Sequence, residues 1–430
     1  MFISHGFLNV LFVMVCFFFF FRGILVRCPL LGAKLPMRLM RLLRLLSAFQ
    51  GLIAAALALS TSASGWAHEP VTRARTPVRI PDIPGYLTLK CDFHIHTVFS
   101  DGLVWPSVRS EEAWREGLDA IAITDHIEYQ PHKADVSTNH NRSHEIAQGP
   151  GAELGLIVIK GSEITRQMPP GHLNAIFLTN ATELAVSGWR ESIAAAHRQG
   201  AFIFWNHPGW SAQLTNDTVV WYAEHTELLQ KGMLHGIEVV NGRDYYPEAH
   251  RWAVEKGLTM LSNSDIHQPL NLDYHVHEAD HRPLTLVFAQ ERTPQSIQAA
   301  LKARRTAVYS GNRLIGDEQF LRPIFERSLV MENRKLSIRG KQRVYVQLHN
   351  GSDVELLLER AGEPKEVSIP KEIIVPGHKT VLLSVTGKTT SEDGQKKLAL
   401  PYLVKNFLVG PDKPLPVELD VEINFTPVPK

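Results

Sequence analysis

The 430-residue chain has only three cysteines, and two of them, Cys16 and Cys28, lie near its N-terminus. Only Cys91 remains in the body of the chain, so an internal disulfide is excluded there and stability must come from core packing. The chain also lacks a basic surplus, because 45 lysines and arginines stand against 44 aspartates and glutamates. This balance does not favour a protein that binds nucleic acid by neutralising its phosphates.

Acidic residues are absent from the first 67 positions, which carry six of the 45 basic residues. Without this segment, 39 basic residues stand against 44 acidic ones, and the net charge is near −5. A mildly acidic body argues against a nucleic-acid polymer as partner and against binding to a membrane surface.

Residues 37–67 have the three parts of a signal peptide: a basic start, an apolar run from Leu45 to Leu59, and small residues before the expected cleavage after Ala67. A membrane anchor is the alternative, but the run is shorter than the roughly 20 residues that a membrane span needs. We therefore expect an exported protein, periplasmic or secreted, that has no contact with the membrane after cleavage.

Residues 1–36 precede this signal and contain an unbroken row of phenylalanines, Phe17–Phe21. We interpret residues 1–36 as a mis-called translation start or a hydrophobic leader. A transmembrane span from Phe7 to about Val26, acting as an N-terminal anchor, is the alternative. Residues 68–86 are expected to form a linker.

Short apolar runs alternate with helical patterns across residues 87–315, which is typical of parallel strands buried on both faces. Seven or eight such units favour a closed α/β barrel over an open sheet. The predicted strands are Leu87–His94, Ala120–Thr124, Leu156–Ile159, Leu173–Leu178, Phe202–Trp205, Gly236–Val240, Leu258–Leu261 and Leu284–Phe288. The predicted helices are Val108–Glu116, Trp189–Gln199, Thr218–Gln230, Pro247–Lys256 and Thr293–Ala303.

Residues 316–430 show a different pattern, in which strands alternate with turn-rich breaks and no good amphipathic helix is expected. The predicted strands are Val344–Leu348, Val354–Leu358, Val381–Val385, Leu398–Val404 and Val417–Phe425. This pattern predicts a small all-β, sandwich-like C-terminal domain, to which we assign no chemistry.

Histidine is concentrated in the predicted barrel, where 16 of the 20 histidines fall between His94 and His281. His94 and His96 stand at the end of the first predicted strand. Residues two apart in a strand point the same way, so both imidazoles can bind one metal ion.

Metal-competent residues also lie at the other strand ends, which converge at one mouth of a barrel. The full set of candidate ligands is His94, His96, Asp101, His126, Glu163, His172, His207, Asp265 and His267. Ordinary hydrogen bonding or helix capping can account for any one of them, but accounts poorly for all nine together.

The motifs that carry these residues follow one another as His94-Ile-His96, Thr124-Asp-His126, Gly161-Ser-Glu163, Asn206-His-Pro208 and Ser264-Asp-Ile-His267. In this order they resemble the PHP (polymerase and histidinol phosphatase) domains, which are distorted seven-stranded β/α barrels with two or three metal ions. The resemblance covers about residues 87–310. With the export signal and the β-rich domain, the chain most resembles the secreted Sb-PDE family of bacterial phosphodiesterases, which cleave phosphate diesters, including organophosphate diesters.

The resemblance implies three metal sites. One ion would be held by His94, His96, Glu163 and Asp265. A second would share Glu163 and add His172 and His207. A third would be held by Asp101, His126 and His267. His172 is the least certain ligand, since family members vary at this spacing after Glu163.

Imidazole and carboxylate ligands together suit divalent Mn, Zn or Fe, and we expect two or three such ions, Mn²⁺ first. A pair of ions makes a bridging hydroxide available near neutral pH. The expected function is therefore metal-dependent hydrolysis of small phosphate diesters. Asp265 is the candidate for orienting the nucleophile or accepting its proton, and His267 or His207 is the candidate for protonating the leaving group.

Residues near these motifs are candidates for supporting roles. Asp92 and Asp125 adjoin ligands and are expected to hold an imidazole by its other nitrogen. Arg166 and Arg243 are candidate phosphate clamps, with ordinary solvated arginines as the alternative. Aromatic candidates for contact with an organic ester group are Tyr129, Trp210 and Tyr245.

Two other functions stay open at this point. A phosphomonoesterase would use the same metal site, and a periplasmic metal-binding protein would hold ions without catalysis. Whether the protein has a protein partner is not predicted from the sequence.

Overall fold

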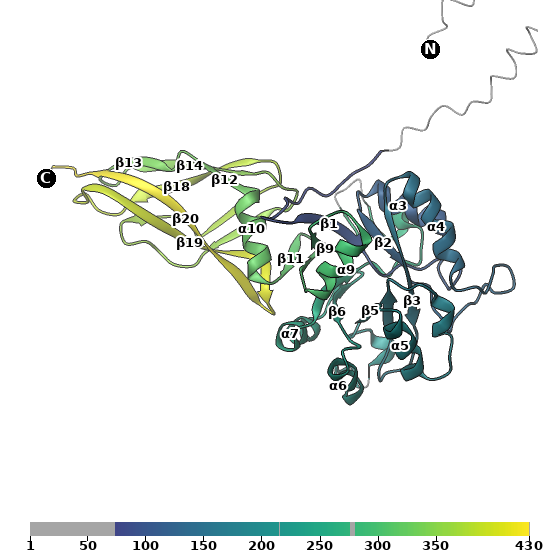
Figure 1. Cartoon of the computed structure of the whole chain (residues 1–430). Coiled ribbons are helices and arrows are strands. Elements are labelled where there is room, and N and C mark those ends of the chain that lie inside the picture. Colours follow the sequence, from purple (N-terminus) through teal and green to yellow (C-terminus); the bar gives the residue numbers. More distant parts are fainter. Residues whose placement is uncertain (1–73, 215, 276–279, 430) are drawn as a thin grey trace, which may run out of the picture. The chain divides into compact units, whose positions relative to one another are not determined.

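The computed structural model describes residues 74–214, 216–275 and 280–429 (Figure 1). The expected leader and signal peptide, residues 1–67, lie outside these ranges, so export stays a prediction, as do the expected domain boundaries. Within the described ranges, no helix is both long enough and apolar enough to cross a membrane.

A ring of strands forms the first part of the described chain, and it confirms the predicted distorted α/β barrel. Its strands are β1 (Leu87–Asp92), β2 (Ala120–Ile123), β3 (Ile157–Ile164), β4 (Leu173–Ile176), β5 (Phe202–Trp205), β6 (Gly236–Asn241) and β8 (Thr259–Asn263). Each strand from β1 to β6 pairs with the next, and β8 pairs with β6. A parallel bridge between Ile95 and Ile266, just beyond β1 and β8, joins the two ends of the ring.

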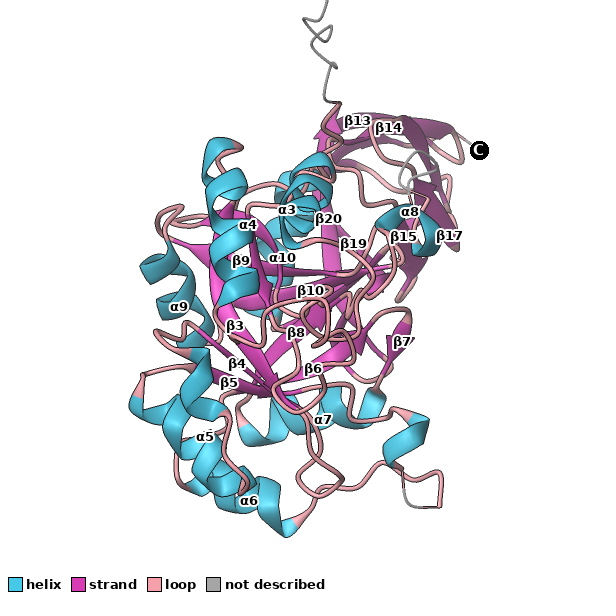
Figure 2. Cartoon of the chain, turned by 90° about the vertical axis from the view of Figure 1, so that its right-hand side faces the viewer, coloured by secondary structure: helices cyan, strands magenta, loops and turns pink. Residues whose placement is uncertain are grey.

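Helices lie outside these strands (Figure 2). They are α3 (Pro106–Arg115), α4 (Arg142–Glu153), α5 (Trp189–Arg198), α6 (Ala223–Gln230), α7 (Pro247–Lys256) and α9 (Pro294–Lys302), with the shorter η2 (Ala181–Leu184), η3 (Ser211–Gln213) and α8 (Leu270–Asp273). Three of them begin with proline, whose missing N–H costs nothing in the first helical turn. The sequence did not predict α4, because Pro150 lies inside it.

Two of the strands predicted to be parallel, β4 in the ring and β9 (Leu284–Ala289) beside it, run in the opposite direction. β4 is antiparallel to both β3 and β5, and β9 is antiparallel to β1. The chain between β3 and β4, residues 165–172, is too short for the crossover that parallel neighbours require. As a result, the start of β4 lies beside the end of β3, and His172 reaches the end of the barrel where the other candidate ligands lie.

The sheet continues past β9 through strands that the sequence did not predict, β10 (Thr306–Ser310) and β11 (Arg313–Gly316), and the two-residue β7 (Asp244–Tyr245) pairs with β6. β11 runs parallel to β19 of the C-terminal region.

A helix, α10 (Glu318–Ser328), opens the C-terminal region and corrects the expectation that no amphipathic helix follows Gly316. Its buried face consists of Phe320, Leu321, Ile324 and Phe325, spaced as one side of a helix. Pro323 lies inside this pattern and hid it at the sequence level.

Two packed sheets follow, as the all-β prediction requires. One contains β13 (Lys335–Arg339), β20 (Lys413–Thr426), β19 (Gly394–Gly410), β15 (Leu356–Arg360) and β17 (Glu372–Val375). The other contains β12 (Leu329–Glu332), β14 (Arg343–Asn350), β18 (Thr380–Gly387) and β16 (Val367–Ser368). Buried and exposed residues alternate along β20, which is typical of a strand with one face in the core.

Candidate metal centre

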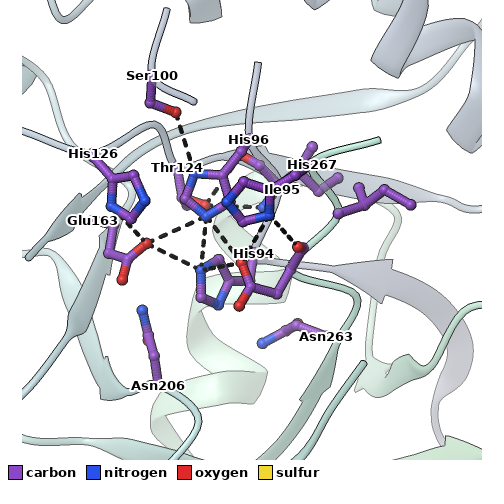
Figure 3. A network of polar contacts seen from close by, with 12 residues as sticks. His94, Ile95, His96, Ser100, Thr124, His126, Glu163, Asn206, Asn263 and His267 are labelled. Atoms are coloured by element: carbon purple, nitrogen blue, oxygen red, sulfur yellow. Dashed lines mark hydrogen bonds and ion pairs between the residues drawn. The ribbon is translucent and has the colours of Figure 1, made fainter. Parts of the chain in front are cut away.

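All nine candidate ligands come together at the end of the barrel where β1, β3 and β8 end and β4 begins. They fall into overlapping groups whose ligand atoms lie within 4.8 Å of one another, and Asp265 joins the first through its own ion pairs. Figure 3 shows five of them converging: His94, His96, His126, Glu163 and His267.

The first group lies deepest. Oε2 of Glu163 is 3.2 Å from Nε2 of His94 and 3.3 Å from Nε2 of His96. Oδ1 of Asp265 is 3.1 Å and 3.0 Å from the same two nitrogens. Both histidines and the glutamate are fully buried, and Asp265 is the one member of this group with an exposed part of its side chain.

The second group uses the other oxygen of the same glutamate. Oε1 of Glu163 is 2.6 Å from Nδ1 of His172 and 3.8 Å from Nε2 of His207. One carboxylate therefore serves two groups, which is the geometry of a bridging ligand.

The third group lies toward solvent. Oδ1 of Asp101 is 3.4 Å from Nε2 of His126 and 3.2 Å from Nε2 of His267. The side chains of Asp101 and His267 are 29% and 33% exposed, whereas those of the first group's histidines are fully buried. Substrate can therefore reach the cluster from the side of the third group.

Glu238, which sequence reasoning missed, holds a ligand from behind. Its Oε1 accepts a 2.9 Å hydrogen bond from Nδ1 of His94, which leaves Nε2 of that ring as the ligand atom. Its other bonds come from the backbone N–H of His207 and the side-chain amides of Asn241 and Asn263. A single glutamate in the otherwise apolar strand β6 was the signal that could have revealed this role.

Asp125 was expected to hold a ligand imidazole directly, but the hydroxyl group of Ser100 lies between Asp125 and His96. Ser100 Oγ donates to Asp125 Oδ1 over 2.7 Å. The same hydroxyl oxygen lies 3.3 Å from Nδ1 of His96 (Figure 3). Because the hydroxyl proton goes to the carboxylate, the serine oxygen accepts from the ring and leaves Nε2 of His96 for a metal.

Asp92 contacts backbone and hydroxyl groups where a ring nitrogen was predicted. It accepts hydrogen bonds from the backbone N–H and the hydroxyl of Ser264, and it pairs with the buried Arg282. Asp92 therefore holds the segment that leads to Asp265, one residue further on.

The pKa values of the first group shift in different directions, and burial with the neighbouring His267 and His126 lowers that of His96. Burial lowers the pKa of His94, but Asp265, Glu238 and Glu163 together raise it well above its ordinary value. Burial raises the pKa of Asp265, and the neighbouring His94 and His96 outweigh this effect and lower it. A site that holds its carboxylates ionised is suited to cations.

Two ligands have strained backbones. Asp265 has φ of 53° and His207 has φ of 27°, both in the left-handed region that non-glycine residues rarely occupy. Such strain persists where the surrounding structure fixes a functional geometry.

The two candidate phosphate clamps are held by other carboxylates. Arg166 pairs with Glu128 at 2.8 Å and donates to the carbonyl oxygen of Val186. Arg243 makes two hydrogen bonds to Asp280. The expectation that these guanidinium groups await a phosphate is therefore not supported by their contacts.

Two of the three aromatic candidates flank the cluster. The ring of Trp210, 44% exposed, lies 5.5 Å from that of His172 and 5.2 Å from that of His207. The ring of Tyr129, 52% exposed, lies 6.3 Å from that of His126. The hydroxyl of Tyr245 instead contacts Nδ1 of His250.

Metal ions fit this donor set. Four buried atoms of the cluster have no hydrogen-bond partner among the described residues: Asp101 Oδ1, Glu163 Oε1, His172 Nδ1 and His207 Nδ1. Leaving buried polar atoms unpaired is costly, and a cation bound by the carboxylate oxygens and imidazole nitrogens would remove that cost for the atoms it contacts. The fold and the cluster thus define a metal-dependent hydrolase of the barrel class.

Comparisons with known proteins agree with this class. A two-domain protein from Bacteroides vulgatus, described as containing a predicted PHP-like metal-dependent phosphoesterase, is 45% identical, with a TM-score of 0.77, over 81% of this chain and 100% of its own. The chain belongs to this family of two-domain PHP-like metal-dependent phosphoesterases. A family model for an Ig-like domain matches residues 329–420.

Two further solved structures are more distant. A structure named as a metal-dependent phosphoesterase, from Bifidobacterium adolescentis, is 20% identical over 41% of this chain and 87% of its own, with a TM-score of 0.33. An amidohydrolase from Chromobacterium violaceum is 16% identical over 51% of this chain and 97% of its own, also with a TM-score of 0.33. None of the curated proteins compared with the chain matches it.

Proposed function

We propose that this chain is an exported phosphodiesterase that hydrolyses small phosphate diesters carrying organic groups, using two or three divalent transition-metal ions, with Mn²⁺ as the first candidate. Export is supported by the signal-like residues 37–67, which lie outside the described ranges. The acidic body of the chain supports a small substrate over a nucleic-acid polymer.

Two exposed aromatic rings carry the preference for a diester. Trp210 lies against the second group of ligands, and Tyr129 lies against the third. A diester has two organic substituents, and each ring offers an apolar surface to one of them. A monoester would leave one ring unused and would bring a second negative charge, while Arg166 and Arg243 already pair with the carboxylates of Glu128 and Asp280.

Bound ions would lower the pKa of a water and neutralise the oxygens of the phosphate. The residues of the chain orient these partners. Oδ1 of Asp265 faces the first group, while Oδ2 lies 3.3 Å from Nδ2 of Asn241, so the carboxylate is fixed in place to accept a proton. His267 donates from Nδ1 to the carbonyl oxygen of Asp265 and presents Nε2 to the open side.

His207 and His267 remain the candidates for the proton donor to the leaving group. His267 is the better placed if its Nε2 carries a proton and no ion, because its side chain is one-third exposed and lies toward the solvent side of the cluster. With a third ion on Nε2, the ring has no proton to give, because its Nδ1–H is already bonded to the carbonyl oxygen of Asp265. His207 is buried, and its Nε2 points toward Glu163.

A direct comparison of two substrates tests the proposal. The purified protein, loaded with Mn²⁺, is given an aryl phosphate diester and the corresponding aryl monoester. We expect kcat/KM for the diester to exceed that for the monoester by at least about tenfold, the scale of one aromatic contact. Faster turnover of the monoester would establish a phosphomonoesterase, and bound metal without turnover of either would establish a metal-binding protein.

A further inference from the structure

Arg109, on the inner side of α3, is a fully buried arginine whose five N–H groups are all hydrogen-bonded. Nε donates to the carbonyl oxygen of His96 over 2.9 Å. The other acceptors are the carbonyl oxygens of Ile266 (3.2 Å), His267 (2.8 Å) and Gln268 (2.8 Å), and Oε2 of Glu112 (2.8 Å). Four of the five bonds therefore go to the backbone of two ligand-bearing segments.

The hydrogen bonds of Arg109 lie next to the last backbone hydrogen bonds between the segment after β1, which carries His94 and His96, and the segment after β8, which carries Asp265 and His267. The N–H of Asp265 donates to the carbonyl oxygen of His94, and the N–H of His96 donates to that of Ile266. Beyond this point the guanidinium group of Arg109 supplies the donors in place of a neighbouring strand. His94 and Asp265 are thus held by the backbone itself, whereas His267 lies in the part held by Arg109.

The segment that carries Asp101 depends on the same region. The N–H of Leu103 donates to the carbonyl oxygen of His267 over 2.8 Å, and the rings of His96 and His267 stack with centroids 4.1 Å apart. A Cβ at Gly102 would lie 2.7 Å from the carbonyl carbon of His96, so the two segments are packed too closely for a larger residue. A shift of His267 would therefore move Asp101 as well.

Glu112 links Arg109 to one more backbone group near His267. Its Oε2 accepts from Arg109, and its Oε1 accepts from the N–H of Leu270 over 2.9 Å, downstream of His267. The second buried arginine, Arg282, differs: it pairs with the carboxylates of Asp92 and Glu116 and leaves Nη2 without a partner among the described residues. Full pairing to ligand-bearing backbone distinguishes Arg109 from a buried arginine that only joins elements.

We propose that Arg109 is a positioning residue that sets the geometry of the third metal group, Asp101, His126 and His267, without touching the metal or the substrate. The inference rests on the proposed function, because it takes this group as an ion site. It deepens that function by naming a residue that would set the affinity for the third ion. Arg109 would do so by holding the backbone that carries the ligands, without binding the ion.

The test measures metal affinity in the full-length protein. Metal-free wild type, Arg109→Lys, Arg109→Met and the control Leu301→Ala are dialysed against buffered Mn²⁺, and bound metal is counted. Leu301 is buried in α9, and its carbonyl oxygen accepts from the hydroxyl of Thr259 at the start of β8, the end opposite the ligands. This control reports general loss of stability.

We expect Arg109→Met to weaken the third ion about 10- to 100-fold, the usual scale for losing a group that orients a ligand. Its first two ions should stay bound. Arg109→Lys keeps the charge and three donors, so it should retain part of the third-ion affinity, and Leu301→Ala should retain all of it. If Arg109→Met fails to fold, Arg109→Lys carries the same comparison.

Three results would overturn the inference: wild-type third-ion affinity in Arg109→Met, parallel loss of all ions in that variant, or equal loss in Leu301→Ala. The proposed function has separate readouts, the ion count of the wild type and its hydrolysis of an aryl diester. A wild type with only two ions would overturn the inference together with the three-ion site, yet its diesterase activity would still be measured independently.

Discussion

Nδ1 of His172 lies 2.6 Å from Oε1 of Glu163, and neither atom has a hydrogen-bond partner among the described residues. A carboxylate oxygen and an imidazole nitrogen this close form an ion pair when the ring is protonated, and a metal ion that takes the place of that proton would bind both atoms. The other oxygen of Glu163 faces His94 and His96. This glutamate is therefore the link between the first two groups of ligands.

The substitution Glu163→Gln tests this link. An amide removes the negative charge that both groups share and offers one oxygen where the carboxylate offers two. We expect the bound metal to fall by more than one ion per chain and diesterase activity to fall at least about a hundredfold. Metal analysis and initial rates measure the two effects.

Glu227→Gln is the matched control, because Glu227 is a surface glutamate that pairs with Arg190 and Lys231. It should keep the metal content and the rate of the wild type. Loss of a single ion in Glu163→Gln, with the others bound normally, would argue against a shared carboxylate.

The substitution Glu238→Gln should weaken the first group while leaving its ligands in place. Glu238 fixes the ring of His94 by accepting from its Nδ1, and groups of this kind are worth about 10- to 100-fold in metal affinity. Competition with a metal chelator measures the change. Unaltered affinity in a folded variant would show that Asn241 and Asn263, which also contact Glu238, are enough to maintain the site.

The metal-free protein should lose stability as the pH rises through the range set by His126. Burial lowers the pKa of this ring, but Glu163 and Asp101 raise it to about 9. Because the folded pKa lies above the unfolded value of about 6.5, the stabilisation is complete below pH 6.5 and is lost by about pH 9. A bound cation must displace the same proton, so metal affinity should rise over this window.

Urea unfolding of the metal-free wild type and of His126→Asn, at pH 6 and pH 9, isolates the contribution of this ring. The difference in the free energy of unfolding between the two proteins should shrink at the higher pH. A difference that grows with pH would mean that the ring is neutral in the folded protein.

The substitution Trp210→Ala should raise KM for an aryl diester by about tenfold and change kcat little, because the role proposed for this ring is contact with an organic group of the ester and not with the reacting atoms. Tyr345→Ala removes an equally exposed ring from the C-terminal sheets and should leave both constants unchanged. A large fall in kcat for Trp210→Ala would instead place the ring among the groups that position His172 and His207.

The order of elements was largely readable from the sequence, and the direction of some strands was not. Phe202–Trp205 and Pro247–Lys256 have the bounds that their patterns predict, because an apolar run and a proline-initiated helix are strong local signals. Strand direction depends on the length of connections and on pairing, so the strand at β4 was predicted but its antiparallel direction was not. α10 and α4 were hidden because each contains a proline.

The candidate ligands were readable because motifs at strand ends converge in a barrel, whatever the details of each strand. The residues that orient them were harder to predict. Glu238 and Arg109 lie within a strand and a helix, where a charged residue cannot be told from a solvated side chain until its burial is known. The ion pairs of Arg166 and Arg243 could not be predicted either, since their partners Glu128 and Asp280 are distant in sequence.

Reconstitution of the metal-free protein tests the central claim most directly. The protein is stripped with a chelator, Mn²⁺ is added back stepwise, and bound metal and hydrolysis of an aryl phosphate diester are measured on the same samples. We predict no hydrolysis without metal and a rate that rises as the second and third ions bind. Hydrolysis by the fully metal-free protein, or a loaded cluster that leaves the diester intact, would contradict the account.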